Sequence, residues 1–148
     1  MMEMREVLKT LRERNHLTQD QMTERVMVSR QAVSRWETGE TQPNIDTLKL
    51  LSREFDVSIN TLLGSPRHLV CQCCGMPLDE DVMISREPDG NFNEDYCKWC
   101  YADGRFVYES KVGLIDFLIG HMPNPDHTPE QERREVYDRY LSQLKHWK

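Results

Sequence analysis

The chain of 148 residues carries a formal net charge of −6, with nine Lys and Arg against ten Asp and Glu in residues 1–64 and ten against fifteen in residues 65–148. Its composition, 38% hydrophobic and 30% charged, is globular, and it has no run of 18 apolar residues and no signal-peptide core. We therefore expect a soluble, cytoplasmic protein without a membrane-spanning segment, whose more acidic second half is unsuited to binding nucleic acid.

The first predicted elements are two short helices. Apolar residues at helical spacing, from Met4 to Leu11, predict a helix over residues 3–14. Thr18 and Gln21 have the spacing of a capping box, so a second helix is expected from Thr18 to about Val26.

The stretch Ser29–Gly39 is predicted to form a third helix with two different faces. Ser29 is a suitable N-cap and Gly39 a typical helix stop. At about 100° per residue, one face carries Ala32, Val33 and Trp36, and the opposite face, an arc of about 140°, carries Arg30, Gln31, Ser34 and Arg35. Arg and Gln pair bidentately with guanine and adenine edges in the major groove. The alternative is an ordinary surface helix with its polar residues outward.

Two more helices complete the first part of the chain. Pro43 and Asn44 open a fourth helix, whose apolar stripe is Ile45, Leu48, Leu51 and Phe55. Ser58 caps a short fifth helix that ends at Gly64. Glycine and proline then mark residues 65–70 as a linker, which divides the chain into domains at 1–64 and 71–148.

Residues 3–64 resemble the Cro/phage-repressor (XRE) helix-turn-helix domain in the stretches 17–22, 28–39 and 43–44. The resemblance implies a five-helix lambda-repressor-like fold and a structural ion pair between Arg12 and Glu37. Met27 stands where the family usually has glycine in the turn. The implied DNA-binding set comprises a phosphate contact and a base-reading helix: Gln19, Ser29, Arg30, Gln31, Ser34 and Arg35. The alternative is a helical bundle that makes only protein contacts.

All five cysteines lie between positions 71 and 100. Two C-x-x-C units, Cys71/Cys74 and Cys97/Cys100, are separated by 22 residues, which is close to the spacing of a four-thiolate zinc site. We therefore expect one Zn²⁺ per chain, held by Cys71, Cys74, Cys97 and Cys100. Four protein ligands leave no open position on the metal, and no nucleophile–base constellation stands out, so we do not expect an enzyme.

Three other residues near this pattern could interact with the metal. Cys73 is the odd cysteine and is interpreted as a free thiol beside the site, with a redox role as the alternative. His68 and His121 are possible ligands, but four correctly spaced thiolates leave neither of them needed.

Residues 71–148 resemble a zinc-ribbon domain of bacterial proteins, in the stretches 71–78, 94–106 and 141–148. A hairpin turn at Asp89–Gly90 and a strand over residues 104–108 are expected. Two helices should follow: one near residues 112–119 that is apolar nearly all round, and one opened by a capping box at Thr128, whose apolar stripe runs from Val136 to Trp147.

The sequence as a whole predicts a mainly α protein: a helix-turn-helix domain followed by a small zinc ribbon of short β-hairpins and two further helices. The favoured function is a sequence-specific transcriptional regulator that binds double-stranded DNA as a homodimer. One alternative is an adaptor whose second domain binds a protein partner. Another is a metal or redox sensor in which loss of zinc changes the affinity for DNA.

Overall fold

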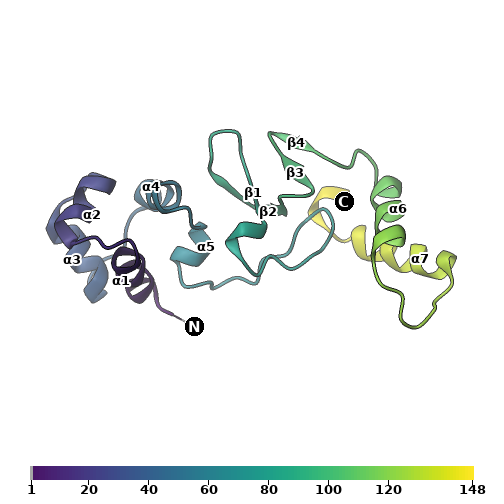
Figure 1. Ribbon diagram of the computed structural model, residues 1–148, viewed down its shortest axis with the longest axis horizontal. Coiled ribbons are helices and arrows are strands. Elements are labelled where there is room, and N and C mark those ends of the chain that lie inside the picture. Colours follow the sequence, from purple (N-terminus) through teal and green to yellow (C-terminus); the bar gives the residue numbers. More distant parts are fainter. Residues whose placement is uncertain (1) are drawn as a thin grey trace. The chain divides into compact units, whose positions relative to one another are not determined.

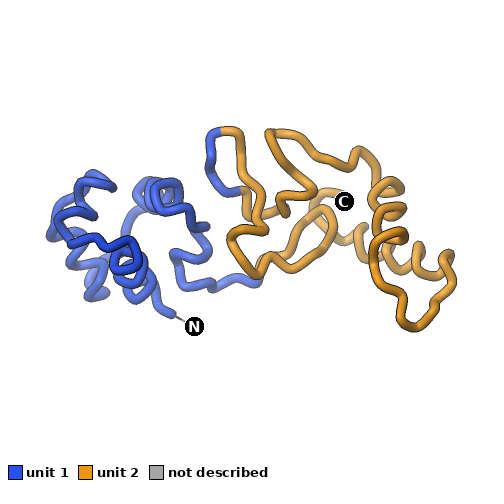
Figure 2. Tube along the Cα trace, viewed as in Figure 1, with its two compact units in different colours: residues 1–68, 89–92 blue, residues 69–88, 93–148 orange. Residues whose placement is uncertain are grey.

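The computed structural model describes residues 2–148. The chain divides into two compact units: unit 1 comprises Met1–His68 and Asp89–Phe92, and unit 2 comprises Leu69–Pro88 and Asn93–Lys148 (Figure 2). Each unit has buried side chains of its own and is described by itself. Within the described range, no helix has both the length and the apolar character that crossing a bilayer requires.

Unit 1 has the five-helix architecture that the sequence predicts (Figure 1). Each of α2 to α5 begins after a polar residue whose side chain accepts the backbone N–H three positions later, at 2.9–3.1 Å: Thr18, Ser29, Asn44 and Ser58. These caps satisfy N–H groups that have no partner within the helix. The helices are α1 (Met4–Arg14), α2 (Gln19–Val26), α3 (Arg30–Thr38), α4 (Ile45–Phe55) and α5 (Ile59–Leu62).

The turn between α2 and α3 is made by Met27, which adopts the left-handed conformation at φ 53°. A side chain with a Cβ is strained in this region, which is why glycine is favoured there. The Met27 side chain is 81% exposed, so it has room in solvent and clashes with nothing. The helix-turn-helix geometry is therefore kept without glycine.

The core of unit 1 forms where α1, α2 and α4 meet α3 and α5. Leu51 of α4 and Leu62 of α5 are fully buried, and the other buried apolar side chains of this core come from α1 to α4: Leu8, Met22, Val26, Val33, Trp36, Leu48 and Phe55. Because Val33 and Trp36 belong to this core, the opposite face of α3 is directed outward.

Unit 2 contains two small two-stranded sheets followed by two helices (Figure 1). The first sheet pairs β1 (Ile84–Arg86) with β2 (Phe92–Cys97), after the 3-10 turn η1 (Asp81–Met83). The second pairs β3 (Tyr101–Ala102) with β4 (Arg105–Phe106) in antiparallel register, with Tyr101 opposite Phe106. The predicted strand over residues 104–108 is thus too long: Gly104 has φ 76° and lies in the turn, and pairing covers only two residues.

The helices α6 (Lys111–His121) and α7 (Glu130–Leu141) pack against each other, and the 3-10 turn η2 (Lys145–Trp147) follows. Leu114, Ile115 and Leu118 of α6 are buried, whereas Val112 and Phe117 are 64% and 41% exposed. The predicted stripe from Val136 to Trp147 is not one helical face, because α7 ends at Leu141 and η2 changes the direction of the chain.

The capping box predicted at Thr128 is also wrong. The N-cap of α7 is Pro129, which makes no side-chain cap bond. Thr128 lies one position earlier, where its backbone N–H donates to Asn124 Oδ1 and its carbonyl accepts Asn124 Nδ2, both at 3.0 Å. Proline fixes the backbone before the helix, so Thr128 belongs to the preceding turn.

Candidate nucleic-acid interface and metal centre

The outward face of α3 presents the side chains that the sequence places there. Arg30, Gln31 and Arg35 are exposed and Ser34 is half-buried, while Val33 and Trp36 on the other face are 1% and 5% exposed. The helix is therefore anchored by its apolar face, and its polar face is free to contact a ligand.

Two arginines of this face lie beside carboxylates of the same unit. Arg30 Nε is 3.6 Å from Asp20 Oδ1, and Arg35 Nε is 3.7 Å from Glu40 Oε2. All four side chains are more than half exposed, and ion pairs of this kind contribute little to stability. Both arginines can therefore leave these carboxylates at little energetic cost.

Gln19 and Ser29 stand at the first turns of neighbouring helices. Gln19 is the first residue of α2 and is half-buried. Ser29 is the N-cap of α3, and its hydroxyl oxygen accepts the N–H of Ala32 at 3.1 Å. The Ser29 oxygen is thus engaged in capping, and its hydroxyl proton remains available to a second partner.

The ion pair between Arg12 and Glu37 fixes α1 against α3, as the sequence resemblance implies. Arg12 Nε and Nη2 donate to the two oxygens of Glu37 at 3.0 and 2.8 Å, and Nη1 donates to the carbonyl of Leu17 at 2.8 Å. The hydrogen bond with Glu37 is the main reason why the pKa of Arg12 is raised. Since neither carboxylate oxygen is left without a donor, Glu37 is held in one orientation.

In unit 2 the four cysteines of the two C-x-x-C units come together. Their sulfur atoms all lie within 4.8 Å of one another, and none is in a disulfide. Cys71, Cys97 and Cys100 are buried, and Cys74 is half-buried, with Cys74 Sγ 3.9 Å from Cys97 Sγ. A tetrahedral zinc site with Zn–S bonds of about 2.3 Å has sulfur–sulfur edges of about 3.8 Å, so the donor set fits such an ion.

The first knuckle, residues 71–75, directs backbone N–H groups at one sulfur. Cys73 N and Cys74 N lie 3.4 and 3.5 Å from Cys71 Sγ. Gly75 has φ 81° and donates its N–H to the carbonyl of Cys71 at 2.8 Å, which closes the turn.

The sulfurs are too close to ionise independently. Hydrogen bonding from Cys100, and then from Cys74 and Cys97, lowers the pKa of Cys71. The same contact with Cys71 raises the pKa of Cys100. Hydrogen bonding with Cys100 also lowers the pKa of Cys97. Four thiolates at this spacing need a bound cation to balance their charge.

The other residues weighed from the sequence are not part of this group. Cys73 is fully buried, but its sulfur is outside the set of four. His121 Nδ1 contacts the carbonyl of Phe117 at 2.8 Å, and its ring stacks on Phe117. Among the described residues, His68 is not gathered with the sulfurs.

Comparison with known proteins assigns both parts of the chain. Residues 8–62 match the family model described as "Helix-turn-helix", and residues 70–148 match the one described as "Putative zinc ribbon domain". The second match covers more than half of the chain. The chain belongs to the zinc ribbon family.

The curated relatives are regulators of transcription by name. Over 63 residues, the chain is 47% identical to the HTH-type transcriptional activator BcrR of Enterococcus faecalis. This match covers 43% of this chain and 31% of that protein. It is 32% identical over 57 residues to the uncharacterized HTH-type transcriptional regulator YobD of Bacillus subtilis (strain 168), covering 38% and 51%. The chain thus spans 31% of the length of the first relative and 51% of the second.

A solved structure also resembles this chain. It is the P22 c2 repressor protein in complex with synthetic operator 9T, in the presence of Tl⁺. The match is 32% identical, covers 44% of this chain and 98% of that one, and has a TM-score of 0.42.

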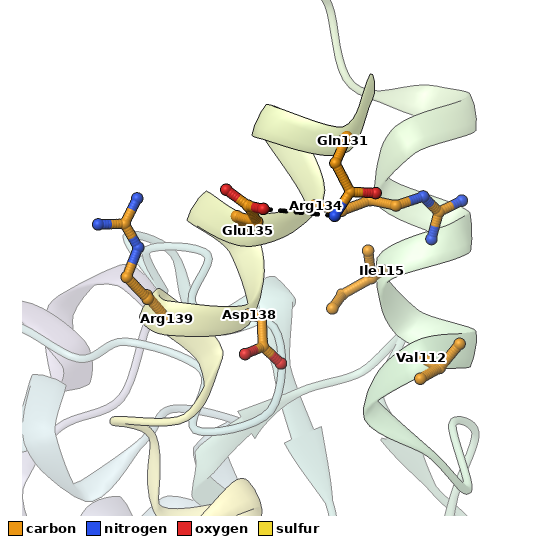
Figure 3. A pocket seen from close by; sticks show the side chains of 7 residues that line it. All are labelled: Val112, Ile115, Gln131, Arg134, Glu135, Asp138 and Arg139. Carbon is orange, nitrogen blue, oxygen red and sulfur yellow. Dashed lines mark hydrogen bonds between the residues drawn. The ribbon is translucent and has the colours of Figure 1, made fainter. Parts of the chain in front are cut away.

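The zinc ribbon also has a groove between α6 and α7, with a volume of about 510 Å³ (Figure 3). Its lining combines an apolar wall from α6 with polar and charged side chains from α7: Val112, Ile115, Gln131, Arg134, Glu135, Asp138 and Arg139. Arg134 is held by Asp116 at 2.8 Å and by Glu130 at 3.0 Å, and Asp138 is held by Lys111 at 2.9 Å. The groove thus places two carboxylates and two guanidinium groups beside apolar side chains of α6.

Sequence reasoning missed several residues that contact the first knuckle of the zinc ribbon. Four residues near the end of the chain donate hydrogen bonds to this knuckle, and Gln72 within the knuckle accepts two of them: Tyr140, Lys145, His146 and Trp147 are the donors. Most of these pairs are 65 to 74 positions apart in the chain. No local pattern predicts such a pairing; the sequence signal is the aromatic side chains Tyr137, Tyr140 and Trp147 on the predicted stripe.

Proposed function

We propose that this protein is a sequence-specific DNA-binding transcriptional regulator whose α3 reads base edges in the major groove. The observation that supports this most directly is the face of α3 that carries Arg30, Gln31, Ser34 and Arg35 outward while Val33 and Trp36 anchor it. Arg and Gln make bidentate pairs with guanine and adenine. The names of the relatives favour the same function.

Gln19 and Ser29 are assigned a positioning role in this proposal. They begin α2 and α3, where N–H groups and short polar side chains suit a phosphate oxygen. Phosphate contacts set the orientation of the protein on the duplex but carry no base information. The six residues together form the proposed DNA interface.

We propose a homodimer because a single copy of residues 1–64 is expected to bind DNA weakly. Residues 1–64 have nine basic against ten acidic side chains, a net −1, so phosphate attraction supplies little affinity. Two copies on a two-fold-related site double the base contacts, with half-sites about one helical turn apart. Exposed Val112 and Phe117 on α6 supply apolar surface for self-association.

The second domain is proposed to hold one Zn²⁺ per chain through Cys71, Cys74, Cys97 and Cys100. The fit of four sulfurs to a tetrahedral ion supports this, and the ion would supply structural cross-linking of the two knuckles. Four ligands leave it no open position, so the proposed role is structural rather than catalytic.

A second function is favoured by the groove between α6 and α7. Its mixed apolar and charged lining suits a segment of another protein, so the zinc ribbon would recruit a partner to the DNA-bound regulator. This adaptor role is compatible with DNA reading by α3, but a partner in the groove and a second copy of this chain on α6 would compete for Val112.

Selection of bound sites from random duplex DNA with the full chain tests the DNA proposal. We expect a two-fold-related motif, and we expect the variant Arg30→Ala/Gln31→Ala/Arg35→Ala to recover no motif. Arg53→Ala is the matched control, because it removes an exposed arginine from α4 and should leave the motif unchanged. Recovery of the same motif by the triple variant would contradict the proposal.

A further inference from the structure

The backbone carbonyls of the first knuckle are bound by a segment far along the chain, residues 140–147. His146 N donates to the carbonyl of Gln72 at 3.1 Å. Trp147 Nε1 donates to the carbonyl of Cys73 at 2.7 Å, and the Tyr140 hydroxyl donates to the carbonyl of Gly75 at 3.1 Å. The segment thus contacts three carbonyls within four consecutive residues.

Two of these bonds act on the same peptide groups that bind sulfur. The peptide between residues 72 and 73 has its C=O bound by His146 and its N–H directed at Cys71 Sγ. The next peptide has its C=O bound by Trp147 and its N–H directed at the same sulfur. Because a peptide group is planar, fixing its carbonyl also fixes the direction of its N–H. The segment therefore sets the geometry of both N–H···S contacts.

Side chains reinforce this attachment. Lys145 N donates to Gln72 Oε1 at 3.1 Å, and Lys145 Nζ lies 2.8 Å from Asp95 Oδ2. Gln72 N in turn donates to the carbonyl of Asp95 at 2.6 Å. The three residues connect the segment, the first knuckle and strand β2.

The segment also lies beside the second knuckle, residues 97–100. The ring of His146 meets Tyr96 edge-on with centroids 5.9 Å apart, and lies 4.3 Å from the ring of Phe106. Tyr96 is buried and directly precedes Cys97. One short segment therefore contacts the first knuckle and also the residue that directly precedes Cys97.

We propose that residues 140–147 are a clasp that forms part of the metal centre, with Trp147 as its main positioning residue. The clasp docks on a first knuckle that is closed around a metal ion, and a docked clasp holds Cys71 in the geometry the ion needs. Coupling of this kind is reciprocal: metal strengthens docking and docking strengthens metal binding by the same factor. The inference rests on the proposed four-cysteine metal site.

The first test measures metal affinity in the full chain, by competition with a chromophoric chelator for Zn²⁺. Removing a group that hydrogen-bonds to a metal ligand typically lowers the affinity for the metal about 10- to 100-fold. We expect Trp147→Phe to weaken Zn²⁺ binding about 10-fold, because phenylalanine keeps a ring and loses the N–H donor. Trp99→Phe is the matched control, since Trp99 lies in the second knuckle, is 52% exposed, and should bind Zn²⁺ like the unaltered protein.

The second test separates positioning from simple folding. The thiolate charge-transfer spectrum of the Co²⁺-loaded protein reports sulfur geometry, and it should shift in Trp147→Phe while far-ultraviolet circular dichroism stays the same. Tyr140→Phe removes one donor from the other end of the clasp and should give a smaller loss of Zn²⁺ affinity. A Trp147→Phe protein with the affinity and Co²⁺ spectrum of Trp99→Phe overturns the clasp.

The third test follows docking itself. The emission of Trp147 is the difference between the spectra of the unaltered protein and Trp147→Phe. We expect it to shift to the red when a chelator removes Zn²⁺, because the indole leaves the knuckle for water. An emission unchanged by chelation overturns the coupling, even with zinc bound tightly. A chain that takes up no zinc at all overturns the metal site itself and the clasp with it.

Discussion

Arg12 on α1 donates to both carboxylate oxygens of Glu37 on α3, at 3.0 and 2.8 Å, with the two side chains 14% and 7% exposed. This pair ties α1 to α3 near the C-terminal end of α3. At about 100° per residue, Glu37 lies beside Arg30 on the helical wheel, so a part-buried ion pair at the edge of the proposed DNA face helps to orient that face.

Glu37→Gln should destabilise unit 1 by about 2 kcal/mol, because one hydrogen bond remains but a part-buried arginine loses its counter-charge. The measurement is urea unfolding followed through the emission of Trp36, which is buried beside this pair in α3, in a chain whose Trp99 and Trp147 are both replaced by phenylalanine. Glu24→Gln, an exposed change on α2, is the control and should unfold like the unaltered chain. Equal midpoints for both variants would show that the pair is not structural.

Arg35→Ala and Gln19→Ala should affect DNA binding in different ways. A base-reading arginine contributes about 1–3 kcal/mol of discrimination, so Arg35→Ala should relax the preference at one base position in each half-site. Gln19→Ala should weaken binding nearly uniformly across sequences, because a phosphate contact carries no base information. Both variants are measured against a panel of single-base operator changes at fixed salt. The reverse pattern would contradict the assignment of α3 as the reader.

Removal of metal should unfold the zinc ribbon and leave residues 1–64 helical. A domain this small has too little core to fold without its cross-link, whereas unit 1 has a core of its own. Elemental analysis should give one zinc per chain, and chelation should reduce only part of the helical circular dichroism. Cys73→Ser should retain the zinc and Cys71→Ser should lose it. A folded ribbon without metal would be the contrary result.

Val112→Glu should shift the protein from dimer to monomer. Val112 is 64% exposed on α6, and a charge there disfavours burial of that face against a second copy. Light scattering of the full chain at tens of micromolar is the measurement. Val107→Glu alters a similarly exposed valine outside the helix, so it should leave the dimer intact. An unaltered chain that is monomeric at this concentration would count against self-association.

Gly75→Ala should damage the metal centre more than Gly90→Ala. Both glycines have positive φ, 81° and 91°, so both substitutions strain the backbone. A methyl group at residue 75 would also overlap the ring of Tyr140, whereas nothing lies within 4 Å at residue 90. The difference in zinc affinity between the two variants, measured by chelator competition, isolates the close approach of Tyr140. Equal affinities would show that this approach is unimportant.

The sequence was sufficient where the signal is local. Capping residues such as Thr18 and Asn44 predicted where helices begin, because a cap bonds only three residues away. Two C-x-x-C units predicted which sulfurs would meet. The prediction at Thr128 failed because Asn124 hydrogen-bonds the backbone of Thr128 and Pro129 takes the N-cap position of α7.

The clasp on the first knuckle could not be predicted in this way. Trp147 and Cys73 are 74 positions apart, and their hydrogen bond depends on the turn that η2 makes after Leu144. The apolar periodicity placed Trp147 on the same helical face as Val136, because it assumes that one helix continues to residue 147. Only the three-dimensional arrangement shows that its indole faces a carbonyl instead.

The carboxylates of Asp20 and Glu40 beside Arg30 and Arg35 bear on how the protein would search a genome. If α3 reads DNA as proposed, each arginine would leave its carboxylate at little cost, because exposed ion pairs of this kind contribute little. The two carboxylates would stay beside the proposed reading face and repel the phosphates of any duplex, cognate or not. The choice among the many competing sites of a chromosome would therefore rest on the base edges that Arg30 and Arg35 contact.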